Sequence, residues 1–111
     1  MQISVTGRHV NVTEEVKAYA REKASKLPRF YDRVQAIEVI LDVEGDSFTI
    51  DMIVSAEGRN HFIAHEVGPD TFALIDLITD KLERQLTRHK ERFRNRKHLA
   101  KKLDKFEETA E

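Results

Sequence analysis

The chain has 111 residues, of which 40% are hydrophobic and 35% charged, a formal net charge of −1, and no cysteine. This length fits one domain with a modest core, and the lack of cysteine excludes disulfides, a thiol nucleophile and cysteine-bound zinc. Because no segment resembles a signal peptide or approaches the roughly 20 apolar residues of a membrane span, we expect a cytoplasmic protein with no membrane partner.

A strand over residues 2–6 and a helix over residues 14–26 are the first expected elements. Thr13 is a typical N-cap, because its hydroxyl accepts a backbone N–H of the first helical turn, and acidic residues follow where the helix dipole favours them. Pro28 disfavours a helical conformation at the residue before it and so closes the helix. The inward face of this helix is predicted to consist of Val16, Tyr19, Ala20, Ala24 and Leu27.

Three further strands are expected to form a meander. Residues 37–44 and 48–55 alternate apolar with polar side chains on either side of a Gly–Asp turn signal, and residues 61–67 follow a second turn at Gly58. The orientation of the last strand stays open, because two alternating sets are apolar: Phe62 with Ala64, and Ile63 with Val67.

A long helix is predicted from Asp70, its N-cap, to about Lys105. Apolar residues recur at steps of three and four in its first half and give one buried stripe: Phe72, Ile75, Ile78, Leu82 and Leu86. Basic residues then take over in two rows, first Lys81, Arg84, Arg88 and Arg92, and second Lys90, Arg94, Lys97 and Lys101. Residues 81–105 hold eleven Lys or Arg against three Asp or Glu, a net of +8, whereas residues 1–80 carry a net of −6.

The element order predicts an α+β fold, β-α-β-β-β-α, in which two helices cover one face of a four-stranded sheet. The other face is expected to be wet and to carry Glu38, Asp42 and Asp51, which repel RNA. A basic patch on one helix is the electrostatic footprint of nucleic-acid binding, and its alternative reading is a solvated helix end. The helical side is therefore the expected binding surface.

The sequence offers little to support catalysis. His61 and His65 lie four residues apart, which on a strand separates them by about 13 Å, too far for shared metal binding. The acidic residues near position 46 lack the pattern of a calcium loop, and neither a nucleophile elbow nor a glycine-rich phosphate loop is present. We therefore expect no enzyme, no metal and no cofactor.

The segments Ile3 to His9, Val12 to Glu14, Lys26-Leu27, Phe30 to Arg33, and Asp80 to Leu86 with His89-Lys90 follow a shared pattern. Together they resemble the ribosome hibernation promoting factor family, which includes the sigma-54 modulation proteins. The resemblance covers residues 2–95 and is strongest from Asp70 to Lys90, where Asp80 to Leu86 with His89-Lys90 resembles the family's second-helix motif. Members fold as β-α-β-β-β-α, similar to a double-stranded-RNA-binding domain. The resemblance implies binding to the small ribosomal subunit, in the channel for messenger and transfer RNA, and inhibition of translation in stress or stationary phase.

Carried over to this chain, the resemblance implies contacts to small-subunit ribosomal RNA from Arg8, Arg21, Lys23, Lys26, Lys81, Arg84, Arg88 and Lys90. Arg92 continues the first basic row and is expected to join them. We expect a ribosome-binding domain over residues 1–95 and a monomer off the ribosome. The basic helical extension and acidic tail over residues 96–111 are not clearly part of the family pattern. Long members carry a further dimerising domain, so the chain resembles a short form or an excised N-terminal domain. Whether it promotes or prevents ribosome pairing stays open.

Two alternative functions remain. The first is a stand-alone binder of structured RNA, which prefers free duplex to intact subunits. The second is a protein-interaction module that uses apolar residues of the C-terminal helix: Phe93, Leu99, Leu103 and Phe106.

Overall fold

The computed structural model describes the backbone of residues 1–105 and the side chains of residues 1–92. The element order is the expected one, which confirms the α+β fold with its β-α-β-β-β-α succession. The elements are β1 (Gln2–Gly7), α1 (Glu14–Ala24), the short 3-10 helix η1 (Leu27–Arg29), β2 (Val34–Glu44), β3 (Ser47–Ala56), the 3-10 turn η2 (Glu57–Arg59), β4 (Asn60–Gly68) and α2 (Thr71–Lys105).

The four strands form one sheet in the order β1-β2-β3-β4. β1 pairs parallel with β2, because α1 carries the chain back across one face, and the other two pairs are antiparallel hairpins. Gly45 and Gly58 supply the hairpin turns with φ angles of 63° and 75°, a region that glycine enters without steric cost. The two turns expected from the sequence are thus confirmed.

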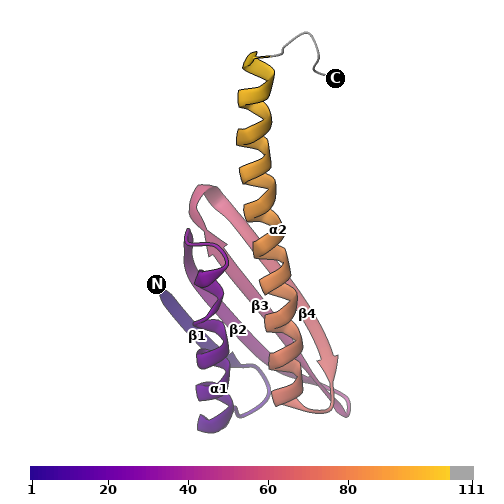
Figure 1. Cartoon of the computed structure of the whole chain (residues 1–111). Helices are drawn as coiled ribbons and strands as arrows, with labels where there is room; N and C mark the ends of the chain where they lie inside the picture. The colour runs from indigo at the N-terminus through magenta and orange to yellow at the C-terminus, as the bar shows by residue number, and fades with distance from the viewer. Residues whose placement is uncertain (106–111) are drawn as a thin grey trace.

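Both helices lie on the same face of the sheet, and the C-terminal part of α2 extends beyond it (Figure 1). The core fills the layer between helices and sheet, and it contains the predicted stripe residues Ile75, Ile78, Leu82 and Leu86. Leu41 and Met52 of the sheet are buried in the same cluster. Phe30 and Tyr31, in the connector after α1, also pack against this core. None of the helices within residues 1–105 has an apolar stretch long enough to cross a membrane.

α1 begins as predicted but ends two residues early. The Thr13 hydroxyl accepts the Val16 N–H at 3.2 Å, as expected of an N-cap. The helix stops at Ala24 because Ser25 turns its side chain back, its hydroxyl donating to the Glu22 carbonyl at 2.7 Å. The Lys26 N–H then bonds only three residues back, so the chain tightens into η1, with Pro28 in its first turn.

The predicted stripe of α2 is wrong at its first member. Phe72 is 42% exposed, whereas Leu74, which the stripe left out, is 2% exposed and packs over Gly68 at the end of β4. The Phe72 ring instead lies edge-on to Tyr19 of α1, with 5.3 Å between ring centroids. The first turn of α2 therefore packs sideways on α1. Asp70 is its N-cap, as expected, since its carboxylate accepts the Phe72 N–H at 3.0 Å.

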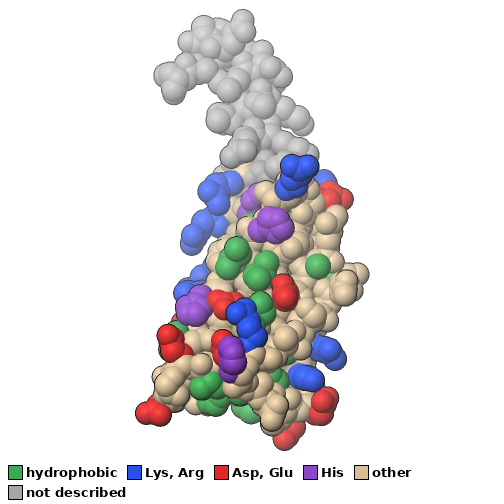
Figure 2. All heavy atoms as spheres, turned by 180° about the vertical axis from the view of Figure 1, so that it is seen from behind, with side chains coloured by type: hydrophobic (Ala, Val, Ile, Leu, Met, Phe, Trp, Pro, Cys, Tyr) green, Lys and Arg blue, Asp and Glu red, His purple; other side chains and the backbone are tan. Residues whose placement is uncertain are grey.

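The structure resolves the orientation of β4: Phe62 and Ala64 are buried, while Ile63 is 61% exposed. The uncovered sheet face carries acidic residues as expected, but also histidines and apolar residues, which Figure 2 shows intermixed on the side behind the helices. This face is therefore mixed in character. Side chains that the sequence placed in the second basic row beyond Lys90, and the apolar set from Phe93 to Phe106, lie outside the described side chains.

Candidate nucleic-acid interface

The two helices run side by side in the same direction over the sheet (Figure 1). One hollow between the helices is lined by Thr13 and Thr71, where α1 and α2 begin. A second hollow is lined by Lys26, in the turn after α1, and by Glu83, further along α2. Basic residues that the sequence assigned to two separate helices thus share one side of the molecule. This helical surface is the candidate interface.

Asp76 of α2 links the helices. The Tyr19 hydroxyl donates to its carboxylate at 2.6 Å, and the Lys23 ammonium lies 3.3 Å from the same oxygen. The hydrogen bond from Tyr19 is the main reason that the pKa of Asp76 lies below its usual 3.8, and Lys23 adds to the effect. Lys23, a predicted RNA contact, is therefore engaged within the protein, and its own pKa is raised by the hydrogen bond with Asp76.

This link predicts a pH-dependent contribution to stability. Because the folded state lowers the pKa of Asp76, the contribution is complete above about pH 4 and disappears as the pH falls through the lowered value. We expect Asp76→Asn to lower the free energy of unfolding by less than about 1 kcal/mol at pH 7, since the pair is partly exposed. Urea unfolding of parent and variant should give a constant difference from pH 5 to 8 that shrinks below pH 4. A difference that grows on acidification would contradict the assignment.

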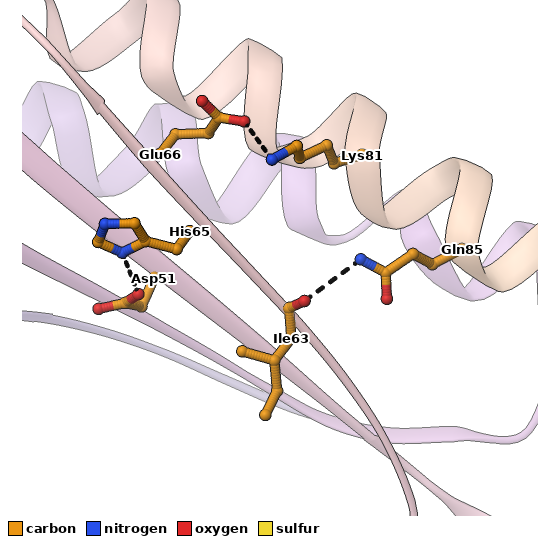
Figure 3. A network of polar contacts seen from close by, with 6 residues as sticks. All are labelled: Asp51, Ile63, His65, Glu66, Lys81 and Gln85. Carbon is orange, nitrogen blue, oxygen red and sulfur yellow. Dashed lines mark hydrogen bonds and ion pairs between the residues drawn. The ribbon is translucent and has the colours of Figure 1, made fainter.

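Lys81 turns toward the edge strand β4. Its ammonium lies 2.6 Å from the Glu66 carboxylate, and one turn further on Gln85 donates to the Ile63 carbonyl at 3.2 Å (Figure 3). The Gln85 contact covers a backbone acceptor of an edge strand, which would otherwise be open to pairing with another chain. Lys81 thus offers its charge at the rim of the candidate interface and shares it with an acid.

The other predicted residues of α2 differ in exposure. Arg84 and Arg88 are exposed and lie about 200° around the helix axis from Leu82 and Leu86, so they point away from the sheet. Arg92 is exposed as well, and Lys90 is half-buried. Among the side chains of residues 1–92, the predicted contacts Arg21, Lys26, Arg84, Arg88, Lys90 and Arg92 have no acidic partner within salt-bridge distance.

Arg8 does not join this group. It follows β1 at the end of the sheet where α1 and α2 begin, and its backbone N–H donates to the Leu41 carbonyl at 2.7 Å. Its charge helps to lower the pKa of Asp42, after the larger effects of the Val43 backbone N–H and of His9. Arg8 therefore lies near the uncovered sheet face, apart from the basic residues at the far end of α1.

Arg29 does join it, although the sequence interpretation left it in a connector. η1 places Arg29, exposed, beside Lys26 at the hollow between the helices. The sequence did contain a signal for Arg29: it is a basic residue next to Pro28, in a segment that joins two buried elements. His89, in contrast, packs edge-on between Tyr31 and Phe62, with centroid distances of 5.0 and 5.1 Å, so its ring is part of the core margin.

The histidines of β4 point to the uncovered sheet face and bond separately. His65 Nδ1 lies 2.6 Å from the Asp51 carboxylate, and His61 Nδ1 lies 3.3 Å from the Ser55 hydroxyl. Within the part of the chain that the structure describes, no three His, Cys, Asp or Glu side chains are grouped as metal ligands are.

The comparison with protein families decides what kind of chain this is. The model of the sigma-54 modulation protein / S30EA ribosomal protein family matches residues 3–94. The chain belongs to this family. It is 37% identical to the ribosome hibernation promoting factor of Azotobacter vinelandii over 83% of this chain and 85% of that protein. It is 36% identical to the factor of Escherichia coli K12, over 85% and 98% of the two chains.

Solved structures of the family share the fold. A ribosomal subunit interface protein from Coxiella burnetii superposes with a TM-score of 0.72 at 26% identity, over 82% of this chain and 99% of that one. The N-terminal domain of Thermus thermophilus Protein Y gives 0.71 at 27% identity, over 80% and 99%. The family resemblance read from the sequence is confirmed.

Proposed function

We propose that this chain is a cytoplasmic ribosome hibernation factor that binds the small ribosomal subunit through its helical surface and inhibits translation in stress or stationary phase. The observation that carries the proposal is the exposed basic surface on two adjacent helices, in a chain whose relatives are named ribosome hibernation promoting factors. The proposed contacts are Arg21, Lys26, Arg29, Arg84, Arg88 and Arg92, with Lys23, Lys81 and Lys90 at the margins and Arg8 apart. No catalytic step, metal or cofactor enters this proposal.

Binding of this kind is dominated by phosphate contacts. Arg and Lys neutralise backbone phosphates and release condensed counterions, so affinity falls steeply with salt. Folded RNA has a deep major groove that side chains cannot read, so discrimination rests on the shape of the RNA surface. A rigid pair of helices, fixed to each other through Asp76, suits recognition by shape.

The proposed unit for binding spans residues 1–95, with residues 96–111 as a separate extension and acidic tail. α2 is continuous across residue 95, and the family model ends at residue 94. This division stays a prediction, as does a monomeric state off the ribosome. Sedimentation of the free chain and of a variant ending at residue 95 tests both.

The proposed location is the channel for messenger and transfer RNA. If the two basic helices occupy it, the protein should inhibit initiation on empty ribosomes and should be excluded from ribosomes already loaded with messenger and initiator transfer RNA. Cosedimentation with purified small subunits, empty or preloaded, measures this directly. Equal binding to both would refute the channel. Preference for free RNA duplex over subunits would instead favour the stand-alone binder of structured RNA.

A further inference from the structure

A notch of about 120 Å³ lies where α1, η1 and α2 meet. It sits within the candidate interface, beside the exposed end of α1. Its lining combines three basic and two acidic side chains with a threonine, an aromatic ring and a buried leucine: Lys23, Lys26, Arg29, Asp80, Glu83, Thr79, Phe30 and Leu27.

The charges of the notch are arranged on opposite sides. Lys26 and Arg29 come from the turn after α1 and from η1, whereas Asp80 and Glu83 come from α2. Among the side chains of residues 1–92, no ion pair within 4.0 Å joins the two sides. Lys23, the remaining basic residue, is drawn to Asp76. The notch thus presents hydrogen-bond donors on one wall and carboxylate acceptors on the other.

Two acids here oppose the rest of the surface. Carboxylates repel phosphates. A surface that served only to neutralise the phosphates of RNA would therefore bind more tightly without carboxylates. Carboxylates do suit the amino and imino groups of bases, which they meet as acceptors. Phe30, half-buried against the core, adds an apolar wall of the kind on which unpaired bases stack.

We propose that this notch holds one unpaired guanine nucleotide of the bound RNA, a step that rests on the proposed function. Guanine carries two adjacent donors, N1–H and the N2 amino group, on its Watson–Crick edge, and the two carboxylates of one wall can accept from them. Asp80 and Glu83 supply the acceptors, Phe30 lies against the base, and Lys26 and Arg29 meet the flanking phosphates. The notch thereby adds base recognition to a surface otherwise governed by shape.

Simple charge repulsion and base recognition predict opposite changes in affinity when the acids of the notch are neutralised. The isosteric variants Asp80→Asn and Glu83→Gln each remove one negative charge, so simple electrostatics requires tighter binding to small subunits. Base recognition instead requires binding about 10- to 100-fold weaker at every salt concentration, with an unchanged salt slope, because every phosphate remains bound. Asp46→Asn and Glu22→Gln make the same changes at exposed positions outside the notch, and we expect unchanged or slightly tighter binding.

Chemical probing identifies the base. Kethoxal modifies the N1 and N2 atoms of unpaired guanines, so the parent protein should protect one guanine of the small-subunit RNA, and Glu83→Gln should restore its reactivity. Phe30→Leu, which keeps an apolar side chain but removes the ring, should weaken binding about 5- to 100-fold while melting is followed in parallel.

The possible outcomes test base recognition by the notch separately from the proposed function. If the parent binds small subunits and both acid variants bind equally or more tightly, or if no guanine is protected, the notch does not hold a base, although the proposed function stands. If the parent fails to bind subunits at all, the proposed function itself falls. Titration with free GMP distinguishes a guanine of ribosomal RNA from a free guanine nucleotide as the ligand. If Glu83 is needed for binding of GMP but no ribosomal guanine is protected, the assignment to RNA is overturned.

Discussion

Changing Lys81, Arg84 and Arg88 together to Ala is expected to weaken binding to the small subunit by a factor on the order of 100 or more, since each charge-assisted hydrogen bond contributes about 1.5–3 kcal/mol. The salt slope should fall by roughly two to three units, about 0.7–0.9 for each phosphate that is no longer neutralised. Thermal melting should change little. Arg84 and Arg88 point to solvent, and the Lys81–Glu66 pair is partly exposed, so its removal costs at most about 1 kcal/mol.

A charge-matched control separates position from total charge. Changing Arg84 and Arg88 to Ala lowers the net charge by two. The control changes Arg33 and Arg59 to Ala, which lowers the net charge by the same amount in the connector before β2 and in η2, outside the two helices. We expect this variant to keep most of its affinity, with a salt slope close to that of the parent. If the α2 triple variant melts normally and still binds as tightly as the parent, the α2 ridge formed by Lys81, Arg84 and Arg88 is not the RNA surface.

The periodicity of the sequence was enough to predict the elements and their layers. Apolar steps of three and four set the inner faces of α1 and α2, and alternation over residues 37–55 set the inner faces of β2 and β3. It was insufficient where two sets are equally apolar, as in β4. There the choice of Phe62 over Ile63 depends on contacts with Tyr31 and His89, which are distant in the sequence.

The first turn of α2 shows the same limit. Phe72 fits the helical period as well as Leu74 does, but α1 lies beside this turn and offers Tyr19 as an edge-on partner. Which residue faces the sheet is therefore set by where the neighbouring helix packs. Single-sequence periodicity holds no information on that packing.

The basic residues of the candidate interface could be found by spacing along a helix, because positions three and four apart share a face. Their partners could not. Glu66 and Lys81 are fifteen residues apart and Lys23 and Asp76 fifty-three, and only the folded chain brings each pair together. The notch could not be predicted for the same reason, since one wall comes from residues 23–30 and the other from the first half of α2.

Leu82→Ala is expected to have the largest effect on stability. Leu82 is fully buried, between Lys81 and Glu83 on the same turn that carries the interface, and its removal leaves a cavity under α2. Such changes cost about 2–5 kcal/mol, a large part of the roughly 5–15 kcal/mol that holds a domain folded. For a chain of this size the melting temperature should fall by about 10–30 °C. Leu77, 52% exposed on the same helix, gives the matched control Leu77→Ala, with an expected loss below about 1 kcal/mol.

This pair of variants also separates folding from binding. Leu82 points into the core and Arg84 away from it, so the folded fraction of Leu82→Ala should bind small subunits with nearly the parent's affinity and salt slope when measured well below its melting temperature. Urea unfolding and subunit binding at several salt concentrations measure the two properties in one preparation. Equal melting of Leu82→Ala and Leu77→Ala would contradict the packing of α2 on the sheet. Loss of affinity in a fully folded Leu82→Ala would mean that the shape of the α2 ridge depends on the core beneath it, and that the arginines alone do not define the interface.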